Sequence, residues 1–335
     1  MNKHDGRKIV FSNVTKSYSG RDVLTDISFS VGEGETLVLI GTSGSGKTTT
    51  LKMINRLIEP TAGNIEIGGR DIAAYDVTAL RRSIGYVVQS IGLFPHMSVS
   101  RNISTVPELL GWSKEKTASR VDELLGMVGL DPAVFRERYP SELSGGQQQR
   151  IGVARALAAD PPIILMDEPF GALDPITREG LQNELAALLR KIRKTVVFVT
   201  HDIFESVILG DRIAVMDEGR IVQTGSPREI VENPEGGFVV DFLGRHRFQL
   251  SLLLTGLGEV TAGTGIPDNT DRAALESAPF LDADSTVLDA LNYFKQYRHE
   301  VIPVRDDGVV TDIVTREKVE QMVCGLMRAE DADAE

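Results

Sequence analysis

The sequence predicts an α/β fold with a mostly parallel sheet, a helical insert and a second, smaller α+β domain near the C-terminal end. Short apolar runs alternate with helical patterns, and three of these runs are typical of buried strands: 36–40, 162–166 and 195–200. The interval of about 94–150 has helical patterns and no strong strand run. It therefore indicates a helical insert between two halves of the sheet domain.

Turn signals place the elements around these strands. A glycine-rich turn follows the strand at 36–40 and leads into an amphipathic helix of about Lys47–Leu57. Two further strand-like runs, 211–216 and 219–224, flank the pair Asp217-Glu218. This arrangement predicts a hairpin at the end of the sheet domain.

The chain is expected to divide near residue 245. The run Phe238–Leu243 is typical of a closing helix, so the first domain is predicted over 8–245. Residues 246–279 are interpreted as a linker or divergent segment. A compact unit is predicted over 280–325, in the order strand, helix, strand, strand, helix. The acidic end, 326–335, is predicted to be disordered.

The composition is that of a globular protein without disulfides. Of the 335 residues 41% are apolar and 25% charged, and the single cysteine, Cys324, suits a reducing compartment. The N-terminal residues lack the apolar core of a secretory signal, and no run approaches the roughly 18 apolar residues of a membrane span. The net charge of -12 argues against nucleic-acid binding. We therefore expect a cytoplasmic protein that acts at a membrane only through a partner.

A phosphate-binding loop lies between the strand at 36–40 and the helix that follows. The segment Gly41-Thr-Ser-Gly-Ser-Gly-Lys-Thr48 satisfies G-x-x-x-x-G-K-[ST] in full. Its glycines allow backbone N–H groups to face phosphate oxygens, and the helix N-terminus adds unpaired donors. Lys47 can reach the β and γ phosphates, and Thr48 can bind Mg²⁺. The predicted nucleotide-binding residues are Gly41, Thr42, Ser43, Gly44, Ser45, Gly46, Lys47, Thr48 and Thr49.

The strand at 162–166 is followed directly by Asp167, Glu168 and Pro169. Carboxylates at the carboxyl end of a parallel strand face the ligand crevice of an α/β sheet. Asp167 is therefore predicted to hold Mg²⁺, directly or through water. Glu168 is predicted to act as the general base on the attacking water.

A second anion-binding element lies about 100 residues after the phosphate loop. Ser144, Gly145, Gly146 and Gln147 precede a predicted helix of about 148–159. Ser144 is a favourable N-cap, and the two glycines permit close approach of a ligand to the backbone. One chain thus carries two elements suited to phosphate.

Over residues of about 8–245 these motifs, in this order, resemble the ABC ATPases, which implies a P-loop NTPase fold of that type. By this resemblance Tyr18 stacks on adenine and Gln89 touches Mg²⁺ and the attacking water. Asp174 belongs to the loop that crosses the dimer, and His201 matches the switch histidine at the γ phosphate.

In this family two ATPase domains pack head to tail, and each ATP lies between the phosphate loop of one copy and the signature of the other, which Ser144–Gln147 match in this sequence. The resemblance implies ATP and Mg²⁺ as cofactors. Its implied partners are a second copy of the chain, transmembrane permease subunits and, indirectly, a substrate-binding protein. We expect Glu168, His201, Lys47 and Gln89 to act in hydrolysis, and Thr48, Gln89 and Asp167 to hold the metal.

The family contains classes that act on other targets. An ATPase of the DNA-repair or chromosome type needs a long coiled-coil insertion, and the roughly 50 residues between Gln89 and Leu143 leave no room for one. Ribosome-acting members typically carry two such domains and basic extensions, whereas this chain has one and is acidic. A transporter subunit at the cytoplasmic face of the inner membrane fits best, with a non-transport ATPase as the weaker alternative.

Four stretches resemble the ATPase subunits of osmoprotectant importers, which serve glycine betaine, choline and related quaternary amines. They are Ile91-Gly-Leu-Phe-Pro-His96, Ser104-Thr-Val-Pro107, Tyr139-Pro-Ser-Glu-Leu-Ser-Gly-Gly-Gln-Gln-Gln-Arg150 and Phe170-Gly-Ala-Leu-Asp-Pro-Ile-Thr-Arg178. The ATPase does not touch the transported solute, so an importer for an amino acid, a polyamine or another small solute stays open.

Residues 280–325 resemble one cystathionine-β-synthase (CBS) repeat, in particular at Val301-Ile-Pro-Val304 and Gly308–Arg316. Asp312 stands where a glycine is usual, and Lys318 stands where an acidic residue would hold a ribose. These departures argue against adenosine binding. Two roles stay open: a dimerising or stabilising appendage, and a sensor of ionic strength or of a cyclic nucleotide. The 17 acidic and 8 basic residues from 246 onward favour a charge-based sensor if there is one.

Overall fold

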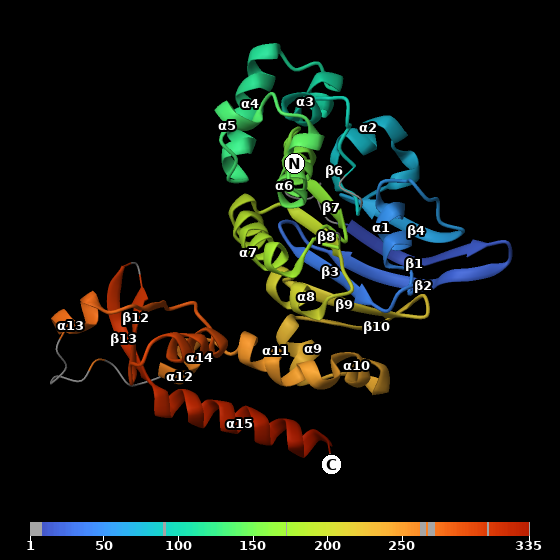
Figure 1. Ribbon diagram of the computed structural model, residues 1–335. Coiled ribbons are helices and arrows are strands. Elements are labelled where there is room, and N and C mark those ends of the chain that lie inside the picture. The colour runs from blue at the N-terminus through green and yellow to red at the C-terminus, as the bar shows by residue number, and fades with distance from the viewer. Residues whose placement is uncertain are drawn as a thin grey trace. The chain divides into compact units, whose positions relative to one another are not determined.

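The computed structural model describes residues 9–89, 92–171, 173–261, 266, 272–306 and 308–334 (Figure 1). Expectations that involve residues 1–8, Ser90, Ile91, Ala172, Asp307 or Glu335, and most of 262–271, lie outside the described residues. The chain divides into two compact units, 1–227 and 228–335. No described helix has both the length and the apolar character needed to cross a membrane.

A six-stranded sheet forms the centre of the first unit, in the order β10-β9-β3-β8-β7-β6. Strands β9, β3, β8, β7 and β6 are parallel, and β10 pairs antiparallel with β9 as the predicted hairpin. The bounds are β3 (Thr36–Gly41), β6 (Ile84–Val87), β7 (Ile163–Asp167), β8 (Thr195–Val199), β9 (Arg212–Asp217) and β10 (Arg220–Gly225). Every residue of β3, β7 and β8 is buried, as expected for parallel strands covered on both faces. The predicted mostly parallel sheet is confirmed.

A second, antiparallel sheet in this unit was not expected from the sequence. Its order is β2-β1-β4-β5, with β1 (Ile9–Tyr18), β2 (Arg21–Val31), β4 (Ala62–Ile67) and β5 (Arg70–Asp71). Helix α1 (Lys47–Ile54) shares one apolar core with both sheets: its Leu51 packs in the cluster that contains Phe11 of β1 and Val197 of β8. This helix ends at Ile54, earlier than predicted, because Arg56 takes a left-handed conformation.

The predicted helical insert is confirmed, and it contains α3 (Val99–Leu109), α4 (Lys114–Met127), α5 (Pro132–Phe135) and α6 (Gly145–Leu157). Ser98, Ser113, Asp131 and Ser144 each accept a backbone hydrogen bond at the start of one of these helices. Figure 1 shows the four helices gathered together in teal and green. They share a second apolar core with the sheet and with α7 (Pro175–Ile192). Two shorter helices, α2 (Val77–Arg82) and α8 (Ile203–Leu209), complete the unit with the 3₁₀ turns Ile72–Ala74 and Pro140–Glu142.

The second unit begins at Arg228 rather than near residue 245. The reason lies in two arginines: Arg228 donates to the carbonyl of Leu254 at 2.9 Å, and Arg247 donates to the carbonyls of Val231 and Glu232 at 2.8 and 2.9 Å. These bonds join the helices on either side of the expected boundary. The helices are α9 (Pro227–Glu232), α10 (Gly236–Leu243), α11 (Arg247–Leu254), α12 (Leu257–Thr261) and α13 (Arg272–Ser277), with a 3₁₀ turn at Gly244–His246.

The remainder of this unit has the predicted order of strand, helix, strand, strand, helix. It contains β11 (Leu281–Asp282), α14 (Val287–Gln296), β12 (Val301–Asp306), β13 (Val309–Thr315) and α15 (Arg316–Ala334), with the sheet order β11-β12-β13. Two expectations need correction. Much of 246–279 is helical, which argues against the linker interpretation and leaves that of a divergent segment in place. Helix α15 continues through 326–334, which was predicted to be disordered. Alanine, methionine, glutamate and arginine dominate that end, and these residues favour helix even where the charge is high.

The central strand β3 provides a test of the core. Leu37 is fully buried there, so Leu37→Ala is expected to lower the free energy of unfolding by about 2–5 kcal/mol through lost burial and a residual cavity. Leu110→Ala removes the same atoms from a side chain that is 44% exposed, and we expect a change within about 0.5 kcal/mol. Denaturant titration followed by circular dichroism measures both. Equal effects of the two substitutions would contradict this placement of the core.

Candidate active site

The phosphate-binding loop connects the end of β3 to the start of α1. Gly46 has φ 100°, and a Cβ there would lie 2.3 Å from Cδ2 of Leu24, so no larger residue fits below the loop. Gly44 has φ 83° and nothing within 4 Å of the same position. The loop is thus closely packed on its protein side and open at Gly44, where a ligand can approach the backbone.

Lys47 lies inside this loop and is 5% exposed. Its Nζ donates to the carbonyls of Gly41 and Thr42, both at 2.8 Å. Burial lowers the pKa of Lys47, and the nearby charges of Glu168 and Asp167 act in the opposite direction. The buried hydroxyl of Ser45 has no hydrogen-bond partner among the described residues. A buried cation and an unsatisfied hydroxyl beside an open glycine backbone suit a bound phosphate group.

Asp167 ends β7, directly beside the start of α1. The hydroxyl of Thr48 donates to Oδ1 of Asp167 at 2.8 Å, and the hydroxyl of Tyr86 lies 3.4 Å from Oδ2. Burial, and then the charge of Asp167, raise the pKa of Tyr86, so this phenol stays a hydrogen-bond donor at neutral pH. Tyr86 was not predicted from the sequence. Its proximity follows from the pairing of β6 with β7, which the sequence of β6 does not specify.

The carboxylate of Glu168 lies close to two other residues that the sequence predicts for the site. Nε2 of Gln89 donates to its Oε2 at 3.0 Å, and Nδ1 of His201 lies 3.4 Å from the same oxygen. The backbone N–H of Glu168 donates to the carbonyl of Val199 on β8 at 3.0 Å, although Glu168 has a left-handed φ of 43°. Such backbone strain in a residue other than glycine is concentrated at functional sites.

The structure therefore brings together Lys47, Thr48, Gln89, Asp167, Glu168 and His201, which the sequence scatters over about 150 residues. No group of three or more histidine, cysteine, aspartate or glutamate side chains able to hold a metal occurs among the described residues. A Mg²⁺ ion here would thus rely on Thr48, Asp167 and the expected ligand Gln89, together with phosphate oxygens and water, since Mg²⁺ at nucleotides usually has few protein ligands.

The signature Ser144–Gln147 lies elsewhere, at the start of α6. Ser144 and Gln147 form a capping box, in which the backbone N–H of Gln147 donates to Oγ of Ser144 at 3.3 Å and the backbone N–H of Ser144 donates to Oε1 of Gln147 at 3.0 Å. Ser144, Gly146 and Gln147 line a cavity of about 450 Å³ together with Thr177. No residue of the phosphate loop, 41–49, lines this cavity.

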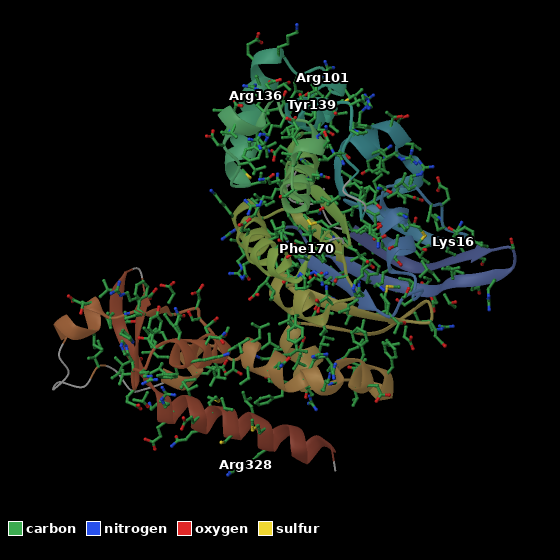
Figure 2. All side chains as sticks on the ribbon, viewed as in Figure 1. Lys16, Arg101, Arg136, Tyr139, Phe170 and Arg328 are labelled. Carbon is green, nitrogen blue, oxygen red and sulfur yellow. The ribbon has the colours of Figure 1, made fainter. Side chains whose placement is uncertain are left out.

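Asp174 and Tyr18 also stand apart from this cluster. Asp174 is the N-cap of α7, and its Oδ1 accepts from the backbone N–H of Thr177 at 3.1 Å. Tyr18 ends β1 with 46% of its surface exposed. Nζ of Lys16, which Figure 2 labels on this strand, lies 4.8 Å from the centre of the Tyr18 ring. An exposed aromatic ring of this kind has a face available for stacking.

Comparison with known proteins identifies a family and relatives that are similar to this chain. The family model for the ABC transporter matches residues 24–171. The osmoprotectant import ATP-binding protein OsmV of Salmonella typhimurium is 53% identical over 258 residues, which cover 76% of this chain and 68% of that protein. The choline transport ATP-binding protein OpuBA of Bacillus subtilis is 45% identical over 315 residues, which cover 93% of this chain and 80% of that protein. The glycine betaine uptake system ATP-binding protein YehX of Escherichia coli is 47% identical over 296 residues, which cover 88% of this chain and 93% of that protein.

Two solved structures are similar to the chain as well. The ATP-binding cassette MJ0796, as a dimer in a post-hydrolysis state bound to ADP and Pi, has a TM-score of 0.58 and 36% identity and covers 65% of this chain and 98% of its own. The protein cbiO1 of Clostridium perfringens, part of the ABC transporter complex cbiONQ, has a TM-score of 0.62 and 27% identity, and the match covers 70% of this chain and 93% of that one. Together with the relatives above, these matches show that the chain belongs to the ATP-binding proteins of the ABC transporter family.

Proposed function

We propose that the chain binds MgATP between two of its copies and hydrolyses it to energise a membrane importer of osmoprotectants. The observation that carries the catalytic part is the convergence of Gln89 and His201 on one oxygen of Glu168, next to the hydrogen bond between Thr48 and Asp167. A general base, its positioning groups and a metal-binding pair thus lie beside a phosphate-binding loop. Phosphoryl transfer depends on such positioning and on charge stabilisation.

Each group has a task that its contacts make possible. Lys47 and the loop backbone bind the phosphates, and Thr48 with Asp167 would hold Mg²⁺. When bound, the metal stabilises negative charge on the phosphate oxygens. Glu168 accepts a proton from the attacking water, while Gln89 and His201 orient that water and the carboxylate.

The second phosphate element supports a site made from two copies. The signature at the start of α6 lines a cavity that contains no residue of its own phosphate loop. Its helix N-terminus would therefore face an ATP bound to the phosphate loop of a partner. Ser144 and the glycine amides would donate hydrogen bonds to the phosphates of that ATP. The dimeric state of the similar cassette MJ0796 supports the same arrangement.

The partner at the membrane is proposed to dock beside the start of the helical insert. A cavity of about 340 Å³ lies there, lined among others by Tyr86, Phe94, Val106 and Arg155. Arg155 donates to the carbonyl of Gly92 at 2.7 Å, which joins this loop to α6. A helix of a permease subunit in this groove would contact the residues next to Gln89, and so link transport to the site. Such a partner would keep the chain at the cytoplasmic face of the inner membrane.

The solute is inferred from the relatives, because the proposed site residues of this chain serve the nucleotide. Proteins named for osmoprotectants, choline and glycine betaine are 45–53% identical to this chain, and the alignments span 68–93% of their lengths. We therefore assign a quaternary amine, delivered by a binding protein. An amino acid or polyamine importer is the alternative.

Within the C-terminal unit, residues 280–325 are proposed to form a CBS-like appendage. Its β11-β12-β13 sheet, with α14 and α15, supports this interpretation through the order of its elements. Its excess of acidic residues from 246 onward would make a surface sensitive to ionic strength, since exposed charges are screened over about 8 Å at physiological salt. A purely stabilising role is the alternative.

Glu168→Gln tests the catalytic assignment. An amide cannot take up the proton of the attacking water, so we expect hydrolysis to fall by about 100-fold or more while ATP still binds. A phosphate-release assay and equilibrium binding of a fluorescent ATP analogue measure the two properties separately. Hydrolysis at the parent rate would exclude Glu168 as the base.

Uptake of labelled glycine betaine and choline tests the transport assignment. The cells have the chromosomal gene for this chain deleted, and a plasmid supplies the parent chain or a variant. We expect the parent to restore uptake at high osmolarity, and Lys47→Ala to abolish it, because the phosphates lose their buried cation. The matched control is Lys52→Ala, which removes a lysine from the last turn of the same helix and is expected to retain uptake.

Two outcomes would count against this proposal in different ways. Failure of the parent chain to restore uptake of either solute would remove the osmoprotectant assignment and leave the ATPase assignment in place. Equal uptake with Lys47→Ala and with the parent would contradict the role of the phosphate loop itself.

A further inference from the structure

A buried polar cluster lies directly behind the loop that carries His201. Its members are Thr200, Gln182 and Glu205, which are 1%, 7% and 4% exposed. Thr200 follows β8, Gln182 lies on α7, and Glu205 lies in the first turn of α8. The proposed reaction gives none of the three a task, and the inference drawn from them rests on that proposed function.

The carboxylate of Glu205 joins two separate elements. The hydroxyl of Thr200 donates to Oε2 at 2.5 Å, and Nε2 of Gln182 donates to Oε1 at 2.9 Å. Burial raises the pKa of Glu205, and the hydrogen bond from Thr200 acts against this rise. A buried carboxyl group is costly without such partners, and an apolar residue would fill the same space at lower cost. Packing alone therefore does not explain why these three buried positions carry polar side chains.

That reason lies in the backbone on either side of His201. The Thr200 hydroxyl accepts a hydrogen bond from the N–H of Asp202 at 2.9 Å, and the N–H of Thr200 donates to the carbonyl of Leu39 on β3 at 3.2 Å. His201 itself has a side chain that is 60% exposed, and its ring lies against Glu168 at 3.4 Å. The position of this ring therefore depends on the backbone of 200–202 rather than on packing around it.

The other end of the bridge reaches α7. Gln182 lies about two turns after Asp174, the N-cap of that helix. Arg178, one turn before Gln182, adds a favourable charge to Glu205 and donates to the carbonyl of Leu173 at 3.1 Å. Glu205 thus connects the His201 loop to the helix that begins at the residue expected to cross the dimer.

We propose that Glu205 is a positioning residue for ATP hydrolysis. Through Thr200 it holds His201 against Glu168, and through Gln182 it fixes this loop to α7. The carboxylate contacts these two side chains rather than the phosphate loop, which lies between β3 and α1. Loss of the bridge should therefore lower kcat and leave ATP binding nearly unchanged.

Thr200→Val tests this without emptying the core, because it replaces the hydroxyl by a methyl group of similar size. We expect kcat to fall about tenfold or more, with the Kd for ATP within about threefold of the parent. Thr200→Ser returns the hydroxyl and is expected to restore most of kcat. Glu205→Ala should resemble Thr200→Val, and its Tm shows whether it folds. The control Glu123→Gln neutralises an exposed glutamate of α4 and is expected to match the parent.

A second measurement separates positioning from general stabilisation. In a His201→Ala background, Thr200→Val should cause no further loss of kcat, because the residue through which it acts is gone. A further independent loss would overturn the proposal, as would parent-like kcat for Thr200→Val alone. Absence of ATPase activity in the parent chain would instead contradict the proposed function, so the two failures are distinguishable.

Discussion

The parallel pairing of β3, β8 and β7 is the constraint on which the rest of the site depends. Their carboxyl ends meet at one edge of the sheet, so the phosphate loop after β3, the two carboxylates at the end of β7 and His201 after β8 become neighbours. Two hydrogen bonds show how close these strand ends are: Thr48 to Asp167, and the backbone of Glu168 to Val199. Ligand sites in α/β sheets form at such an edge for this reason.

The remaining elements support that edge in different ways. The antiparallel sheet covers α1, and its Leu24 fills the space directly below Gly46, so it supports the phosphate loop from underneath. The helical insert holds the signature at the start of α6, where a capping box fixes Ser144 and Gln147. The bridge through Glu205 then links the His201 loop to α7. Packing or hydrogen bonds thus support the phosphate loop, the signature and the His201 loop, and precise positioning requires such support.

The sequence predicts those site residues that lie directly after a clear strand pattern or directly before a clear helix pattern. Lys47, Asp167, Glu168 and His201 each lie next to an apolar run, and the same runs predict the mostly parallel sheet. Their roles stay predictions, as do those of Tyr18, Gln89, Asp174 and the signature. The roles of Tyr18, Gln89, Asp174 and His201 rest on the resemblance to the family, because the spacing of these residues in the sequence does not by itself define a role.

Other features depend on strand order and long-range packing, which a single sequence does not specify. Tyr86 reaches Asp167 because β6 pairs with β7, and Glu205 meets Gln182 because α8 packs beside α7. The antiparallel sheet is not evident from the sequence, because bulges interrupt the register of β1 with both of its neighbours. The end of the chain is helical despite its acidity, because its helix propensity outweighs the effect of its charge.

The central claim is that each ATP is hydrolysed between the phosphate loop of one copy and the signature of another. Mixing two inactive chains tests it most directly: one carries Lys47→Ala, and the other carries Ser144→Arg, which places a large side chain at the signature. A dimer of one with the other contains one site with both elements intact. The account predicts that the mixture recovers ATP hydrolysis that neither chain has alone. No recovery from a mixture shown to form mixed dimers with ATP would contradict it.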